Sequence, residues 1–465
     1  MGDKDSHPSA EDINREITNL ILESRPRPFS VESVRVSGQV HTKPWVFSSA
    51  FGPFYSSKTL GGVLSASQTV HDRLARLGIF SEVDIGLDAS PTGGDAVDVV
   101  LRVKERPRLF IKTGTEIGTS DGSLTTSVNV RNVFGGAETI HGSAVYGMET
   151  DAALSSATSA RDASFASSAS TAFTLVAAKP LWANPDHVVE VGVGKSDKSQ
   201  LRYSSFVETE TGLTANYKTL FPLGTAEVGY SSQWRHVHNL SSNASMSIRS
   251  SAGHTLKSAL HATLSHDVRD DPVLPTSGHA ARVTAEVAHP SLGGDVVGAK
   301  VDGELSLGRK LGHGFSVQAG LRAGLLVPLA GYTTRVNDRW FLGGPTTVRG
   351  FRHHGIGPKD GEDALGGDAF WAAGVSLFTP VPWLGEGPIK GHLFANVGGL
   401  GILKDGPTAP ALLDLVSNPS ASAGAGIAVR FSIARLELNY CLPLAMRRGD
   451  DARVGWQLGL GVQFL

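Results

Sequence analysis

The stretch FSVQAGLRAGL, residues 315–325, shows the pattern that decides the fold of this chain. Every second residue from Phe315 to Leu325 is apolar, and the residues between them are serine, glutamine, glycine and arginine. Because successive side chains of a strand point to opposite faces, the pattern predicts a strand with one apolar and one polar face. In a soluble sandwich the apolar face is a packed interior, crowded with large side chains in mostly short strands. Small and polar side chains over long segments instead suit a polar lumen behind a lipid-facing surface.

The same two-residue period recurs along the chain after residue 108. It is clear over residues 435–442 and again over residues 456–464. Because lipid offers no water to the open edge of a sheet, strands that cross a membrane must close into a barrel. The sequence therefore predicts a mainly β protein with an antiparallel transmembrane β-barrel over residues 108–465. Its sixteen strands are expected to begin near residues 109, 124, 138, 164, 187, 205, 224, 254, 278, 299, 314, 368, 389, 421, 435 and 455.

Residues 29–107 follow another pattern and predict a separate small domain. FSVESVRVSG, residues 29–38, looks like a strand, and helical spacing follows over residues 63–77, with Gly78 well placed as its end. Two further alternating strands are joined by the turn SPTGGD, residues 90–95. This order of elements predicts one small α+β domain directly before the barrel.

The N-terminal lead, residues 1–28, is predicted to carry a short amphipathic helix. Ile13, Ile17, Leu20 and Ile21 fall on one helical face. The segment is acidic and has no apolar core, so it does not have the pattern of a cleavable secretory signal.

Composition and spacing exclude several classes of function. The formal net charge of −2 is not that of a nucleic-acid-binding protein, which needs a strongly basic face. The one cysteine, Cys441, excludes an internal disulfide framework. No Ser-His-Asp set or phosphate-binding loop is present, so we expect no enzyme activity and no cofactor. His266 and the nearby Asp267, Asp270 and Asp271 favour a turn-stabilising network over a metal site, because the usual ligand spacing is missing.

The longest interval without a predicted strand, residues 328–367, contains RWFLGGPTTVRGF, residues 339–351. Pro345 lacks a backbone donor and paired glycines destabilise helices and strands, so this stretch must be a loop. Its aromatic and leucine side chains favour an ordered, packed loop. Arg349 is then expected to fold back into the polar lumen, where a guanidinium finds several acceptors. The alternative is a solvated surface loop.

Three motifs, in this order, resemble the outer-membrane protein assembly superfamily, whose members join POTRA domains to a barrel. They are DVRDDPVLPTSGH (267–279), RWFLGGPTTVRGF (339–351) and GGDAFWAAGVSLFTPVP (366–382). The resemblance covers about residues 29–465. One POTRA domain and no secretory signal are most similar to the mitochondrial branch, the central barrel subunits of the sorting and assembly machinery.

This resemblance implies a function. The protein would insert β-barrel precursor proteins into the mitochondrial outer membrane, with its POTRA domain in the intermembrane space. The first and last barrel strands would form a lateral seam at which a precursor strand pairs. Implied partners are the precursors, outer-membrane lipid and two peripheral accessory subunits on the cytosolic face, with no nucleic acid. The alternatives are a translocation or secretion pore of the same superfamily and a passive outer-membrane channel.

The resemblance also implies roles for particular residues. Arg349, Gly350 and Phe351 would reach the barrel wall and steady the seam. Many relatives supply a carboxylate for this arginine from the twelfth or thirteenth strand, where this chain has Ser376 and Asn396. The partners considered for Arg349 are therefore Asn396, backbone carbonyls or another carboxylate such as Asp368. The expected loop anchors are Trp340, Phe341, Gly343 and Gly344, and the last strand carries the signal read in client proteins at Gln457, Gly459, Leu460, Val462 and Phe464.

Overall fold

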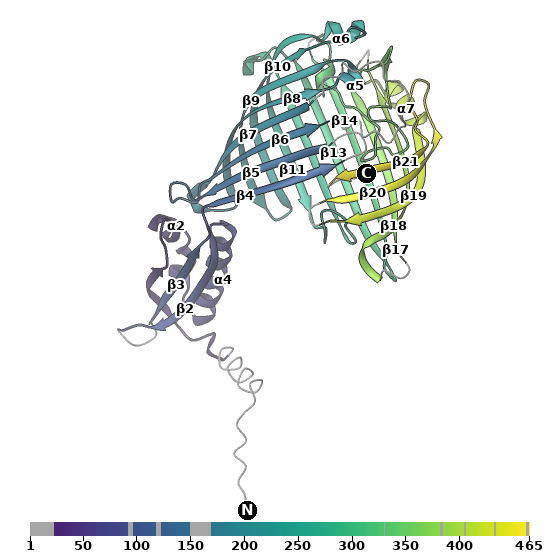
Figure 1. Cartoon of the computed structure of the whole chain (residues 1–465). Helices are drawn as coiled ribbons and strands as arrows, with labels where there is room; N and C mark the ends of the chain where they lie inside the picture. Colours follow the sequence, from purple (N-terminus) through teal and green to yellow (C-terminus); the bar gives the residue numbers. More distant parts are fainter. Residues whose placement is uncertain are drawn as a thin grey trace, which may run out of the picture. The chain divides into compact units, whose positions relative to one another are not determined.

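The computed structural model describes residues 23–91, 96–117, 122–148, 169–329, 331–381, 385–403, 406–431, 434–461 and 465. The predicted helix around Ile13–Ile21 and the strand residues Val462 and Phe464 lie outside these ranges. The chain divides into two compact units (Figure 1). Their segments are Met1–Phe110, Asn129–Ile140 and Ala177–Val189 in the first, and Ile111–Val128, His141–Val176 and Glu190–Leu465 in the second.

The first unit contains the small α+β domain that the sequence predicts. Its three strands pair in the order β1-β3-β2, with β1 parallel and β2 antiparallel to β3. The longest helix buries Val63, Ala66, Val70 and Leu74 on one face, and the Thr59 side chain caps its start. The elements are β1 (Ser30–Ser37), α2 (Pro44–Ser48), α3 (Gly52–Ser56), α4 (Leu60–Arg76), β2 (Phe80–Ala89) and β3 (Ala96–Glu105).

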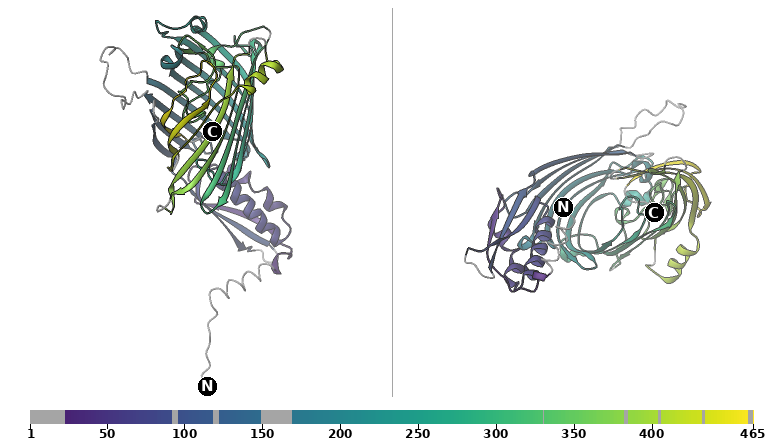
Figure 2. Two further views of the ribbon diagram at one scale, coloured as in Figure 1. Left: turned by 90° about the vertical axis from the view of Figure 1, so that its right-hand side faces the viewer. Right: turned by 90° about the horizontal axis from the view of Figure 1, so that it is seen from below.

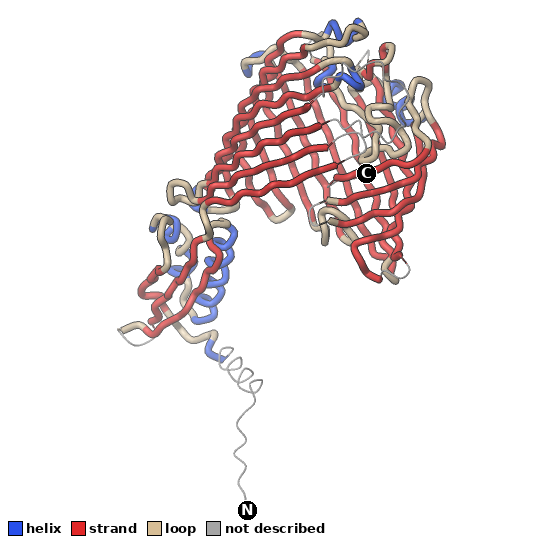
Figure 3. The backbone as a smooth tube through the Cα atoms, viewed as in Figure 1, coloured by secondary structure: helices blue, strands red, loops and turns tan. Residues whose placement is uncertain are grey.

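A sixteen-stranded sheet follows, as the alternation predicts, and its strands pair in the order of the sequence. Figure 2 shows how the sheet curves round, and Figure 3 shows the strands as the dominant element of the chain. The strands are β4 (Leu109–Ile117), β5 (Gly122–Arg131), β6 (Thr139–Met148), β7 (Ala169–Pro180), β8 (His187–Ser199), β9 (Val207–Phe221), β10 (Gly224–His238), β11 (Gly253–Asp267), β12 (Gly278–Ala288), β13 (Gly298–Gly312), β14 (Phe315–Pro328), β17 (Ala369–Val381), β18 (Gly385–Gly401), β19 (Ser420–Arg430), β20 (Arg435–Ala445) and β21 (Gly455–Gly461).

Connections alternate between the two ends of the barrel because neighbouring strands run in opposite directions. We call the end at which β4 begins the proximal end and the other the distal end. The turn between β11 and β12, residues 268–277, lies at the proximal end, and the loop of residues 329–368 starts at the distal end. The short connecting helices are η1 (Leu181–Ala183), α5 (Leu201–Ser204), α6 (Met246–Ser250), η2 (Pro290–Leu292) and α7 (Ala409–Ser417).

The two faces of the sheet differ in chemistry. On β10, Val228 and Trp234 are exposed, whereas Ser231 and Arg235 on the opposite face are buried. An outer face of exposed apolar side chains matches a lipid-facing surface, and polar side chains line the lumen. Among the described residues, no helix is both long enough and apolar enough to cross a membrane.

The loop of residues 329–368 packs inside the barrel. It contains η3 (Val336–Asp338) and the short pair β15 (Lys359–Asp360) and β16 (Asp363–Ala364). Its apolar side chains form a buried cluster with residues of the barrel wall. The cluster consists of Leu342, Val348, Phe351, Ile356, Ala372, Leu400 and Leu465.

Candidate functional site

Glycines let the loop approach its neighbours closely. Gly343 and Gly350 have positive φ angles of 108° and 80°, which side chains other than glycine rarely adopt. A Cβ atom at Gly343 would lie 2.6 Å from the backbone oxygen of Arg352, and one at Gly350 would lie 3.0 Å from Cβ of Ser422. Both positions therefore need glycine for the observed path of the loop. Gly344 is similar, with φ of 116°.

Two aromatic side chains, Trp340 and Phe341, hold the part of the loop that precedes Arg349. Trp340 exchanges two backbone hydrogen bonds with Gly367, at 3.1 and 2.9 Å. The ammonium group of Lys300 lies over the Trp340 ring, 4.5 Å from its centre. Phe341 stacks on His354, with 4.4 Å between the ring centres. These two predicted anchors thus contact a strand of the wall and a later part of the loop.

Arg349 lies at the tip of the loop and is fully buried. Its Nε donates to Oε2 of Glu437 at 2.9 Å, and one terminal nitrogen lies 2.8 Å from the same oxygen. The other terminal nitrogen donates to Oδ1 of Asn396 at 3.0 Å and to the backbone oxygen of Leu465 at 3.2 Å. The guanidinium also lies 5.0 Å from the centre of the Phe394 ring.

Glu437 on β20 is shared between two cations. Its Oε1 lies 2.9 Å from Nε of Arg435, and its Oε2 accepts from Asn439 at 2.9 Å as well as from Arg349. Arg435 and Glu437 are 2% and 1% exposed, so the three charges interact with little screening by water. Removing the Glu437 carboxylate from this buried set would cost roughly 3–5 kcal/mol, because the two guanidinium charges would be left uncompensated. We call Arg349, Glu437, Arg435 and Asn396 the Arg349 cluster.

The loop tip is also bonded to the last strand. The amide oxygen of Gln457 on β21 accepts from the backbone N–H of Gly350 at 2.9 Å, and its amide nitrogen donates to the carbonyl of Phe351 at 2.9 Å. The connection between β20 and β21 adds backbone hydrogen bonds from Arg453 to Gly350 and from Arg352 to Asp451. The motif thus contacts β20 and β21, the last two strands of the sheet.

The partner of Arg349 differs from part of the expectation. Asn396 accepts a hydrogen bond from Arg349, as considered, but Asp368 is occupied elsewhere. The Asp368 carboxylate lies 3.3 Å from Nε of Arg339 and accepts from the backbone of Leu403 at 3.2 Å. The carboxylate beside Arg349 comes from Glu437 on β20, the fifteenth strand of the barrel. A signal for it existed in the alternating polar residues of β20, although many strands share such alternation.

Of the other residues predicted to act in the last strand, two lie in its ladder with β20. Gly459 pairs with Glu437 and Leu460 pairs with Leu436 in the β20–β21 ladder. Val462 and Phe464 lie outside the described residues.

A second polar anchor, which the sequence analysis missed, holds the base of the loop. Asp338 forms a two-point ion pair with Arg235 at 2.8 and 3.3 Å and accepts from Lys257 at 3.1 Å. Next to it, Asn337 donates to Glu208 at 3.0 Å. Burial by itself would raise the pKa of Asp338, but Arg235 and Lys257 outweigh it and lower the pKa to about 2. The two cations therefore favour the charged form of this carboxylate.

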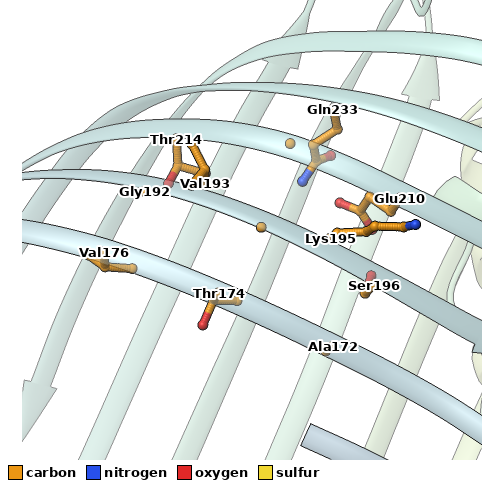
Figure 4. A pocket seen from close by; sticks show the side chains of 12 residues that line it. Ala172, Thr174, Val176, Gly192, Val193, Lys195, Ser196, Glu210, Thr214 and Gln233 are labelled. Atoms are coloured by element: carbon orange, nitrogen blue, oxygen red, sulfur yellow. The ribbon is translucent and has the colours of Figure 1, made fainter. Parts of the chain in front are cut away.

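The turn around Asp270 and a pocket on the barrel wall are two further polar regions. The carboxylate of Asp270 accepts hydrogen bonds from the backbone N–H groups of Thr276 and Ser277, both at 2.9 Å, which is the expected turn network. Within the described part of the chain, no group of three histidine, cysteine or acidic residues is placed to hold a metal ion. A pocket on the wall formed by β7 to β10 is lined mainly by small and polar residues, and Figure 4 shows them on neighbouring strands. They include Thr174, Gly192, Ser196, Glu210, Thr214 and Gln233.

Comparisons with known proteins agree on one family. The Omp85 superfamily domain matches residues 132–464. The sorting and assembly machinery component 50 homologue of Mus musculus is 34% identical over 470 residues, which are 98% of this chain and 94% of that protein. A SAM50-like protein of Schizosaccharomyces pombe is 31% identical, with coverages of 99% and 96%. The crystal structure of Haemophilus ducreyi BamA lacking POTRA domains 1–3 matches with a TM-score of 0.75 at 17% identity, covering 93% of this chain and 84% of that one.

Proposed function

Because this chain belongs to the Omp85 superfamily, and within it is a homologue of sorting and assembly machinery component 50, we propose that it inserts β-barrel precursor proteins into the mitochondrial outer membrane. The barrel spans that membrane, and the small α+β domain serves as a POTRA domain in the intermembrane space. The observation that carries the proposal is the buried bonding of the loop tip to β20 and β21, the last two strands of the sheet.

The proposed working surface is the meeting of the first and last strands. The strand order of the sheet ends with β4 on one side and β21 on the other. A terminal strand presents backbone donors and acceptors on which an incoming strand can add. A precursor strand would pair there, and the seam would open sideways into lipid.

The Arg349 cluster supports this mechanism from the luminal side. Arg349 of the loop pairs with Glu437 on β20, while Gln457 on β21 donates a hydrogen bond to the loop. This bracing would keep β20 and β21 in place while the outer edge of β21 exchanges its partner. No nucleotide or chemical step is needed, because burial of apolar surface and satisfaction of backbone hydrogen bonds favour the inserted barrel.

The proposed partners are barrel precursors and membrane lipid, together with accessory subunits. Two peripheral subunits would lie on the cytosolic face, which corresponds to the distal end if the POTRA domain faces the intermembrane space. A passive channel is the weaker reading, because the lumen holds a packed loop anchored by two buried sets of ion pairs. A translocation pore of the same superfamily differs from an insertase in the fate of the cargo.

Depletion of the protein in its host distinguishes these functions. Newly made barrel proteins of the mitochondrial outer membrane should fall selectively, while helix-anchored proteins of the same membrane stay constant. Precursors should still be imported and accumulate unfolded. Normal barrel levels combined with loss of another cargo would replace the insertase by a pore.

A further inference from the structure

The turn of residues 268–277 is a second segment that folds into the barrel, from the proximal end. Val273 and Leu274 at its centre are 5% and 3% exposed. Leu274 packs with Phe378 of β17 and Ala428 of β19 in one buried cluster. In the order of the sheet, β13 and β14 lie between β12 and β17, so the turn reaches across the lumen to a distant part of the wall.

Internal hydrogen bonds give this turn a defined conformation. Asp270 accepts from the side chain of Thr276 at 2.5 Å as well as from two backbone N–H groups. Asp271 accepts from the backbone N–H of Val273 at 2.8 Å and from Nε of Arg430 at 2.5 Å. The turn is therefore fixed both within itself and against the end of β19.

A continuous set of contacts connects the turn to the Arg349 cluster. The side-chain nitrogen of Gln318 on β14 donates to the carbonyl of Pro275 at 2.7 Å. Because a carbonyl can only accept, this bond turns the amide oxygen of Gln318 toward Arg435, which donates to it at 3.1 Å. Arg435 in turn lies 2.9 Å from Glu437, the partner of Arg349. The ring of Phe378, which packs on the turn, also lies 5.4 Å from the Arg435 guanidinium.

We infer that the turn of residues 268–277 is a positioning element for the Arg349 cluster. It orients Gln318, which orients Arg435, and Arg435 holds Glu437 facing the loop tip. The loop contacts β20 directly at Glu437, and the turn is connected to β20 through Gln318, so two inward segments from opposite ends of the barrel both act on the neighbour of the last strand. The consequence for insertion rests on the proposed function, whereas the structural coupling does not.

The chain carries its own reporter for this coupling. Cys441, its one cysteine, is fully buried beneath the loop tip. A Cβ atom at Gly350 would lie 3.5 Å from Cβ of Cys441, and its sulfur lies 3.4 Å from the Gln457 amide oxygen. A water-soluble maleimide can reach this thiol only when the loop tip leaves its seat.

The test measures the rate at which this maleimide labels the purified full-length protein in detergent micelles. Arg349→Ala is the reference for a released loop. We expect Gln318→Leu to speed labelling roughly tenfold over the unmodified protein, the effect of losing one hydrogen bond to a charged group. Gln233→Leu is the matched control, because Gln233 lines the pocket on the β7–β10 wall, apart from these contacts, and it should label at the unmodified rate.

Asp271→Asn provides a second variant that leaves Gln318 and the cluster unchanged. It weakens the contact of the turn with Arg430, so labelling should again accelerate. Trypsin resistance of the barrel verifies folding of each variant. The inference would be overturned if Gln318→Leu and Asp271→Asn were both labelled at the rate of the unmodified protein while Arg349→Ala was labelled fast.

A precursor-insertion assay with the same variants separates the two proposals. Slower insertion in the rank order of the labelling rates supports both. Faster labelling with an unchanged insertion rate would support the structural coupling but would show that the position of the loop tip does not control insertion.

Discussion

At the scale of single residues, Glu437 is the most heavily used group of the site. Its one carboxylate lies between the guanidinium groups of Arg349 and Arg435, and all three side chains are buried. Loss of either arginine leaves a neutral pair, whereas loss of the carboxylate leaves two cations facing each other. Loss of the carboxylate should therefore destabilise the protein more than loss of either arginine.

We predict that Glu437→Gln releases the loop more strongly than Arg349→Gln does. The first variant should cost roughly 3–5 kcal/mol and the second less, because Arg435 still neutralises Glu437. Maleimide labelling of Cys441 and the insertion rate both measure the difference. Equal effects of the two variants would show that Arg349 acts through its other acceptors, Asn396 and Leu465.

Gly350 offers a prediction about close approach. Gly350→Ala meets both a positive φ angle and a Cβ contact of 3.0 Å with Ser422, whereas Gly331 has a similar φ of 77° with open space around it. Gly331→Ala should cost only about 1–2 kcal/mol of backbone strain. Gly350→Ala should cost more and should expose Cys441 to maleimide. Similar behaviour of both variants would mean that strain alone, without crowding, decides.

We predict that His354 makes the stability of the protein sensitive to pH. Burial, reinforced by His353, lowers the pKa of His354 to about 3. An unfolded chain binds this proton near the usual pKa, so the stabilisation is complete above pH 6.5 and is lost as the pH falls toward 3. From pH 7.5 to 5.0 the free energy of unfolding should fall by up to about 2 kcal/mol through this group.

Guanidinium unfolding in detergent micelles checks this expectation. His354→Asn removes the titrating imidazole and keeps a residue that tolerates the positive φ of 56°. The variant should therefore lose less stability between the two pH values than the unmodified protein. An equal loss in both proteins would assign the pH dependence to other groups.

At the scale of elements, the loop is fixed to two parts of the wall. Its base is held by Asp338 against β10 and β11, and its tip by Arg349 against β18 and β20. A loop tied at one end could pivot, whereas one tied at both ends holds its middle in a single position. The two anchors explain how a segment with little regular structure packs as an ordered part of the interior.

Asp338→Asn tests the second anchor. The variant leaves Arg235 and Lys257 buried beside a neutral group and should lower the free energy of unfolding by roughly 3–5 kcal/mol. Asp414→Asn is the control, because its pair with Arg447 is exposed and should contribute under about 1 kcal/mol. Protease cleavage within the loop should increase only in the first variant. An equal loss of unfolding free energy in the two variants would mean that water already screens the charges of Asp338, Arg235 and Lys257.

At the scale of the whole molecule, the sheet has two terminal strands, β4 and β21. If a precursor adds there, it must contact outward-facing residues of these strands and not those elsewhere on the barrel. Ile111 of β4, Trp456 of β21 and Val283 of β12 are comparably exposed, at 58%, 61% and 50%. They form a matched set for photo-crosslinking.

We predict that a photoreactive residue at position 111 or 456 captures an arrested barrel precursor, and that one at position 283 does not. Capture at all three positions would indicate unspecific adsorption to the lipid-facing surface. Capture at none of them, with active insertion, would move the working surface away from the terminal strands.

Much of this architecture was accessible from the sequence by itself. The two-residue period predicted sixteen antiparallel strands in one sheet, because it acts on a local pattern. The change of period before residue 108 determined the α+β domain in the same way. The glycines and the proline of 339–351 predicted a loop, and its aromatic residues favoured a packed loop over a solvated one.

The partners inside the lumen were decided only by the tertiary structure. Arg349 and Glu437 are 88 residues apart in the chain, and Gln318 and Pro275 are 43 apart. Polar residues alternate on most of the strands, so no local signal distinguishes Glu437 from the Asp368 that sequence analysis considered. Which of them meets Arg349 depends on strand register and on the path of two inward segments. Those are set by the packing of the whole barrel, since a shift of one residue would turn every luminal side chain to the lipid.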